Sequence, residues 1–88
     1  MATFLVEAYT PAAAELADVQ ARIRAAADAT TKEGVAVLYI RSILVPGDET
    51  CFHVFEGPSQ EAVAEVGRRA SLAFTRIVEA LSASAKEV

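Results

Sequence analysis

The sequence predicts an α+β domain whose elements follow the order β-α-β-β-α-β. Four stretches carry alternating or β-branched apolar residues, as strands do, and two stretches carry apolar residues at helical spacing. Turns that contain proline or glycine separate several of these stretches. The chain has 88 residues, which is enough for one domain and no more.

The first strand is expected over residues 3–9, and the first helix is expected to start at Thr10-Pro11 and to end before Gly34. Apolar side chains alternate along 3–9, as in a strand that buries one face. Thr10 offers a hydroxyl that can cap a helix, and Pro11 suits the first helical position because no backbone donor is needed there. Apolar residues then recur at helical spacing, and Gly34 ends this unit.

The second half of the chain predicts two strands, a helix and a last strand. These elements are expected at 35–45, 50–56, about 60–70 and 75–81. Residues 46–49 form the turn of a hairpin, and Ser59 opens the helix. Gly67 inside this helix costs about 1 kcal/mol relative to alanine, which predicts close packing there. Residues 1–81 form a single domain, and residues 82–88 lose periodicity and are expected to fray.

This order of elements is that of the ferredoxin-like fold. Right-handed crossovers place both helices on one face of an antiparallel sheet with strand order 4-1-3-2. The opposite face of the sheet is then left uncovered by the chain itself.

Side chains alternate along a strand, so each can be assigned to one face of the sheet. The face under the helices is expected to hold Phe4, Val6, Ala8, Leu38, Ile40, Ser42, Leu44, Phe52 and Val54. The open face is expected to hold Leu5, Glu7, Tyr9, Tyr39, Arg41, Ile43, Cys51, His53 and Phe55. This assignment requires an odd number of residues in the connection around Gly47, or a bulge. A regular two-residue turn would pair Arg41 with Val54 and contradict it.

The expected open face collects the residues that can carry chemistry. The candidates for ligand binding are Glu7, Tyr9, Tyr39, Arg41 and His53, and the candidate metal ligands are His53 and Glu7. The expected homodimer face consists of Leu5, Tyr39, Ile43, Cys51 and Phe55. A monomer rarely leaves so much apolar area in water, and two such sheets can stack face to face.

Composition argues against several classes of function. The net charge is −4 and the basic residues are scattered, which disfavours nucleic acid and anionic membranes as partners. Cys51 is the only cysteine, so an intrachain disulfide and a multi-cysteine zinc site are excluded, and a lone thiol suits the cytoplasm. No signal peptide or membrane span is expected. Although 53% of the residues are hydrophobic, 19 of them are alanine, which predicts a thin core and a partner surface.

Several short motifs occur together along the chain. They are Phe4-Leu5-Val6-Glu7 followed by Thr10-Pro11, Leu38-Tyr39-Ile40-Arg41-Ser42-Ile43, Phe52-His53-Val54-Phe55 leading to Gly57-Pro58-Ser59, and Glu61-Ala62-Val63 through Arg68-Arg69-Ala70. As a set they resemble a small bacterial domain family of uncharacterised function that includes a homodimeric, nickel-binding, ferredoxin-like protein. The resemblance covers residues 3–81. It implies the fold, a homodimer and nickel or another divalent metal as the ligand to consider.

The chain departs from the family at positions that would bind metal. The family typically has one histidine where this chain has Arg41, another where it has Val66, and a cysteine where it has His53. Arginine stays protonated and cannot ligate a metal. The resemblance therefore implies the fold and the dimer more directly than it implies nickel binding.

Three functions fit these residues. The first is a small cytoplasmic homodimer that binds a metal ion or small ligand over the open face. The second is a cofactor-independent dimeric α+β barrel enzyme of isomerase, cyclase or oxygenase type, with His53 or Glu7 as acid or base and Arg41 holding an anion. The third is an interaction module without a ligand. Local alternatives stay open for several residues. Glu7 can instead form a salt bridge to Arg41 or to a partner subunit, and His53 can be a hydrogen-bonded interface residue. Cys51 can be a packed thiol or a nucleophile, and Tyr9 and Tyr39 can line a ligand pocket or pack in the interface.

Overall fold

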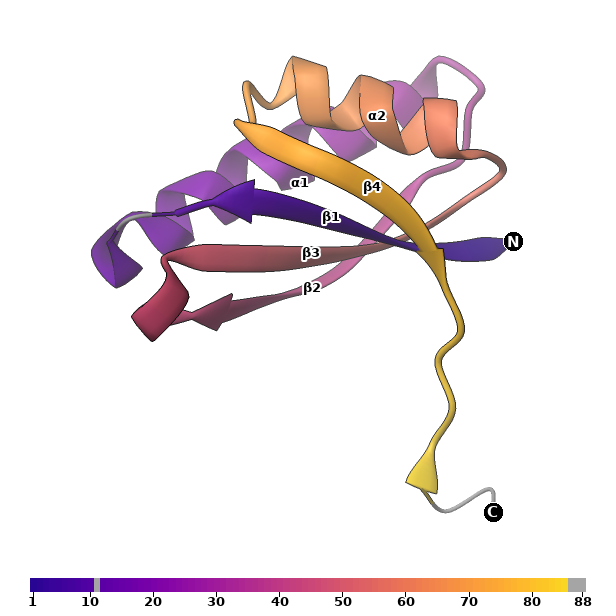
Figure 1. The fold of residues 1–88 in the computed structure, drawn as a ribbon. Helices are drawn as coiled ribbons and strands as arrows, with labels where there is room; N and C mark the ends of the chain where they lie inside the picture. Colours follow the sequence, from indigo (N-terminus) through magenta and orange to yellow (C-terminus); the bar gives the residue numbers. More distant parts are fainter. Residues whose placement is uncertain (11, 86–88) are drawn as a thin grey trace.

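The computed structural model describes residues 1–10 and 12–85. Four strands form one antiparallel sheet in the order β2-β3-β1-β4, and two helices lie on one of its faces (Figure 1). The elements are β1 (Ala2–Tyr9), α1 (Leu16–Lys32), β2 (Leu38–Val45), β3 (Thr50–Gly57), α2 (Gln60–Arg69) and β4 (Phe74–Ala80). Read from the other edge, the strand order is 4-1-3-2, so the predicted ferredoxin-like α+β fold is confirmed.

Helix α1 begins later than expected, so the prediction of a Thr10 cap is wrong. A short 3₁₀ turn at Ala13–Glu15 precedes the helix, and neither element has a side-chain cap. Thr10 is buried, and its backbone N–H donates to the Glu49 carbonyl at 2.8 Å, which holds it against the β2–β3 connection. The helical position expected for Pro11 and part of the frayed tail, 86–88, lie outside the described residues.

The end of α1 and the start of α2 follow from residues that predict them in the sequence, Gly34 and Ser59. Gly34 has a φ of 105°, a left-handed conformation that suits glycine after the end of α1. The hydroxyl of Ser59 accepts a 3.1 Å hydrogen bond from the Ala62 backbone N–H and so caps α2. The close packing predicted at Gly67 is confirmed, because a Cβ there would lie 2.8 Å from the ring of Phe74.

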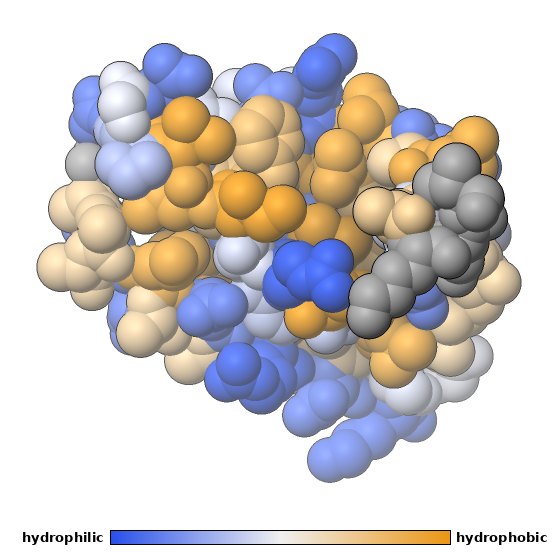
Figure 2. Space-filling view, turned by 90° about the horizontal axis from the view of Figure 1, so that it is seen from below, coloured by the Kyte–Doolittle hydropathy of each residue, from blue (hydrophilic) through white to orange (hydrophobic). Residues whose placement is uncertain are grey.

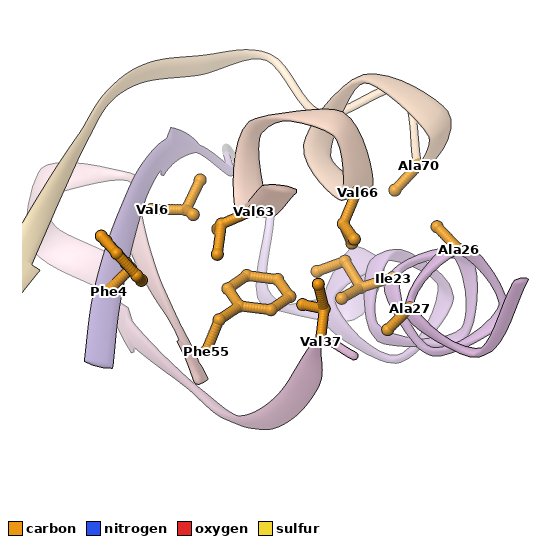
Figure 3. Close-up of a cluster of buried hydrophobic side chains, with 10 residues drawn as sticks. All are labelled: Phe4, Val6, Ile23, Ala26, Ala27, Val37, Phe55, Val63, Val66 and Ala70. Atoms are coloured by element: carbon orange, nitrogen blue, oxygen red, sulfur yellow. The ribbon is translucent and has the colours of Figure 1, made fainter. Parts of the chain in front are cut away.

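The core lies between the sheet and the two helices (Figure 3). Its buried members are Phe4, Val6, Ile23, Ala26, Ala27, Val37, Phe55, Val63, Val66 and Ala70. Figure 3 shows Ala26 of α1 on the side toward Ala70 of α2, so small side chains let the two helices approach closely. In the described part of the chain, neither helix is long and apolar enough to cross a membrane.

The connection between β2 and β3 reverses the faces expected for β3. Val45 pairs with Thr50, so four residues form the connection, and Arg41 pairs with Val54. A connection of four residues pairs the two strands in the same register as a two-residue turn. This is the register that contradicts the expected faces of β3. Cys51, His53 and Phe55 therefore lie under the helices, and Phe52 and Val54 lie on the open face. The burial agrees, because Cys51, His53 and Phe55 are each 0% exposed.

A bulge at Ile40 changes the faces at the start of β2. Tyr39 pairs with Phe55, and Arg41 pairs with Val54, so Ile40 is the extra residue. Tyr39 consequently lies under the helices, while Leu38 and Ile40 are 50% and 41% exposed. The expectations for these three residues are wrong. The residues after the bulge, 41–44, and the alternating residues of β1 lie on the faces predicted for them.

Candidate functional site

The predicted functional residues fall into two separate groups, one on each face of the sheet. We call Tyr39, Ser42, Cys51 and His53 the buried polar cluster. The central residues of the uncovered face are called the open-face lattice. They are Arg41, Val54, Leu5, Val78, Ile43, Phe52, Glu7 and Arg76.

The buried polar cluster is a chain of hydrogen bonds between β2 and β3. Ser42 Oγ and His53 Nδ1 share a hydrogen bond of 2.6 Å, and the Tyr39 hydroxyl is hydrogen-bonded to Ser42 Oγ. Cys51 Sγ lies 3.8 Å from the same His53 nitrogen. The ring of Tyr39 also packs against Phe55, with centroids 5.4 Å apart. One ring nitrogen of His53 is therefore fully engaged.

Burial shifts the pKa values of two groups next to Ser42, His53 and Cys51. Removal from water lowers the pKa of His53 to about 4, so the imidazole is neutral at neutral pH. Burial also raises the pKa of the Cys51 thiol, although a hydrogen bond from Ser42 acts in the opposite direction. A protonated, inaccessible thiol is a poor nucleophile. Packing is the better interpretation of Cys51.

The other ring nitrogen of His53 is unusual. Nε2 is buried and has no hydrogen-bond partner within residues 1–10 and 12–85. An unsatisfied buried polar group costs roughly 1–3 kcal/mol, and ordered water or a ligand often satisfies it. A neutral imidazole can donate or accept at Nε2, depending on its tautomer. Of the cluster, Tyr39 alone lines a hollow of about 280 Å³ between α1 and β2.

The open-face lattice consists of two rows of paired residues. One row runs Arg41, Val54, Leu5 and Val78 across β2, β3, β1 and β4, and the next runs Ile43, Phe52, Glu7 and Arg76. Figure 2 looks onto this side from below and shows an apolar surface interrupted by hydrophilic residues. Ile43 is 50% exposed there, whereas Val54 at the centre is only 9% exposed.

The charges of the lattice are unevenly matched. Arg76 Nε donates to Glu7 Oε1 at 3.0 Å, so Glu7 pairs with Arg76 and not with Arg41. Arg41 is exposed and makes no ion pair with any residue in the part of the chain that the structure describes. This cation, without an ion pair among the described residues, thus lies beside apolar neighbours.

The structure separates residues that the sequence brought together. Glu7 and His53 lie on opposite faces, because Val6, the neighbour of Glu7, pairs with His53. The two residues cannot share a metal or a substrate within one chain, so the expected joint site is wrong. Tyr9 lies at the end of β1, where it lines a hollow of about 130 Å³ and its hydroxyl donates to Glu49 at 3.5 Å.

Sequence reasoning missed four residues of these sites: Ser42, Phe52, Val54 and Arg76. Ser42 was the one polar residue expected on the face under the helices, and that signal pointed to a buried hydrogen-bond partner. Arg76 lies in the last strand, whose apolar residues alternate only in part and so do not assign its side chains to faces. Phe52 and Val54 could have been found only with the correct length of the β2–β3 connection.

Fold and surface define a small ferredoxin-like α+β domain with one largely apolar sheet face that neither helix covers. The chain belongs to the SCO4226-like family, described as nickel responsive protein SCO4226-like, whose model matches residues 4–80. The crystal structure of SCO4226 from Streptomyces coelicolor A3(2) is similar to it, with a TM-score of 0.75 and 27% sequence identity. The match covers 93% of this chain and all of that one. No curated protein matches the chain.

The residues of this chain do not fit a nickel site within one subunit. Nowhere in the described ranges do three His, Cys, Asp or Glu side chains gather closely enough to hold a metal ion. Of the positions that the family resemblance singled out, Arg41 is on the open face, and Val66 is 0% exposed in the core. His53 lies under the helices with Cys51 as its one soft neighbour. These three positions therefore lie too far apart in the fold to bind one metal ion together.

Proposed function

We propose that this chain acts as a homodimeric interaction protein of the nickel-responsive family, and that it assembles through its open sheet face. One observation carries the proposal: the face opposite the helices presents apolar side chains to solvent around Arg41, which has no ion pair within residues 1–10 and 12–85. Leu38 and Ile43 are each 50% exposed, and Ile40 is 41% exposed. Patches of this kind mark interaction surfaces in small proteins.

Burial of this face in a dimer adds apolar contact area that the small core of one chain does not provide. A domain of this size removes only roughly 60% of its unfolded surface from water. Face-to-face stacking of two sheets, about 10 Å apart, covers apolar side chains on both subunits at once. The family description names a response to nickel, but the donor groups of residues 1–10 and 12–85 form no nickel site within one chain, so the proposed function includes none.

Sedimentation velocity of the untagged protein tests the assembly. We expect a species of twice the 9.3 kDa chain mass at micromolar concentration. Ile43→Lys places a charge on the open face and should convert the dimer to monomer. Val35→Lys is the matched control, because Val35 is 40% exposed but lies beside Glu33 and Glu61, away from this face. A monomeric wild type, or equal effects of both variants, would contradict the proposal.

A second candidate function is the binding of a small hydrogen-bonding ligand at the buried polar cluster. The unpartnered Nε2 of His53 favours it. A high-resolution crystal structure of untagged protein tests it. Density larger than a water molecule within hydrogen-bond distance of Nε2 supports the function, and a single ordered water or no density contradicts it.

A further inference from the structure

We infer that Arg41 of one subunit pairs with Glu7 of a second copy, and that this reciprocal contact sets the register of the dimer. The inference rests on the proposed function, because it requires the open faces to meet. It concerns a different property, namely how the two faces are aligned.

The open-face lattice has a diagonal arrangement of charge. Arg41 begins one row on β2, and Glu7 is the β1 member of the next row. Between these corners lie four apolar side chains, Val54 and Leu5 in the first row and Ile43 and Phe52 in the second. The cation and the anion therefore lie at opposite corners of a block of two rows with three residues each. We call the four apolar members of this block the apolar square.

A twofold dimer makes use of such a pattern. In an isologous interface residue i contacts residue j, and residue j contacts residue i, so one complementary pair occurs twice. The midpoint between Arg41 and Glu7 lies over β3, next to Phe52 and Val54. A twofold axis that runs between the two sheets, through this midpoint and perpendicular to the line from Arg41 to Glu7, places each Arg41 over Glu7 of the second copy. It also keeps the apolar square covered on both sides.

Desolvation favours an anionic partner for Arg41. Covering the face removes water from a guanidinium that has no ion pair in the described chain, which is costly unless an anion replaces the water. Glu7 can serve as that anion. Its Oε1 accepts from Arg76, and in the described residues Oε2 has no hydrogen bond, so the carboxylate can accept a second guanidinium.

Glu56 is the competing carboxylate. It pairs with Thr3 and Leu38 and therefore lies on the same face. The midpoint between Arg41 and Glu56 falls between β2 and β3, near the edge of the sheet. Docking about that point leaves Leu5 at the rim and covers less of the apolar square, so Glu7 is the better partner.

Mixing two charge-reversed variants tests the register. Arg41→Glu and Glu7→Arg each create two like-charge contacts in their own homodimer, which should weaken it on the order of 100-fold or more. In the mixed dimer both contacts join opposite charges again. Native mass spectrometry of the mixture should therefore show mostly heterodimer.

Arg41→Glu mixed with Glu56→Arg is the matched control and should give no preferred heterodimer. Preferred heterodimer in this control but not with Glu7→Arg overturns the inferred register. Homodimers as stable as wild type for both single variants also overturn it and leave the proposed dimer standing. A monomeric wild type refutes the proposed function itself.

Discussion

The two faces of this sheet come from the same strands but have opposite physical character. On β3, alternate residues such as Phe55 and His53 are fully buried under the helices, while Phe52 and Val54 face outward. The face under the helices holds a neutral imidazole and a protonated thiol in a dry core. The open face holds Arg41, Glu7 and Arg76 among apolar side chains. A shift of one residue in β3 exchanges these roles, so register decides which residues can meet a partner.

The largest expected effect is a difference in stability between variants of two phenylalanines of β3, Phe55 under the helices and Phe52 on the open face. Phe55→Ala removes a ring that is 0% exposed and should lower the free energy of unfolding by roughly 3–5 kcal/mol. Phe52→Ala removes a partly exposed ring on the open face and should cost roughly 1 kcal/mol or less in the monomer. Urea denaturation at low protein concentration measures both.

Phe55→Leu and Phe52→Leu form a milder pair that keeps the order measurable if Phe55→Ala does not fold. At high protein concentration Phe52→Ala should additionally weaken the dimer. Equal losses of stability for the two alanine variants would contradict the assignment of faces.

The fold could be predicted because the periodicity of most elements is unambiguous. The residues of β1 alternate cleanly, and α2 is announced by Ser59 and by apolar spacing. The faces of β3 could not be predicted in the same way, because Phe52, Val54 and Phe55 put large apolar side chains on both parities. For β3, only the length of the β2–β3 connection decides which residues face the helices. For the candidate site, Leu5, Glu7, Arg41 and Ile43 were placed correctly, since their faces do not depend on that connection or on the bulge.

The buried imidazole predicts a specific pH dependence of stability. The pKa of His53 is about 4 in the folded chain and near 6.5 when unfolded. Between these values the unfolded chain binds the extra proton, so stability is full above pH 6.5 and is lost as the pH falls toward 4. The slope approaches roughly 1.4 kcal/mol per pH unit, about 3 kcal/mol in total. Chemical denaturation at pH 7, 6 and 5 measures it.

His53→Gln is the matched control, because it removes the titration while keeping a hydrogen-bonding side chain beside Ser42. His53 is the single histidine of the chain, so no other histidine contributes in this range. Arg69 holds the pKa values of Glu33 and Glu65 below their usual range, so their stabilisation is lost at lower pH, below about 4.5. An unchanged slope in His53→Gln would show that His53 is not the buried neutral group.

The smallest expected effect concerns nickel, the metal that the family description names. His53→Gln should leave the heat of nickel addition unchanged in calorimetry of untagged protein at near-neutral pH. His53 lies under the helices, and stable metal sites in proteins usually combine three or four donor side chains, whereas only Cys51 offers a further soft ligand here. Glu7→Gln provides the control from the other face. A saturable nickel isotherm in the wild type that His53→Gln abolishes would show that the buried polar cluster opens to bind metal. Both faces of the sheet would then be functional.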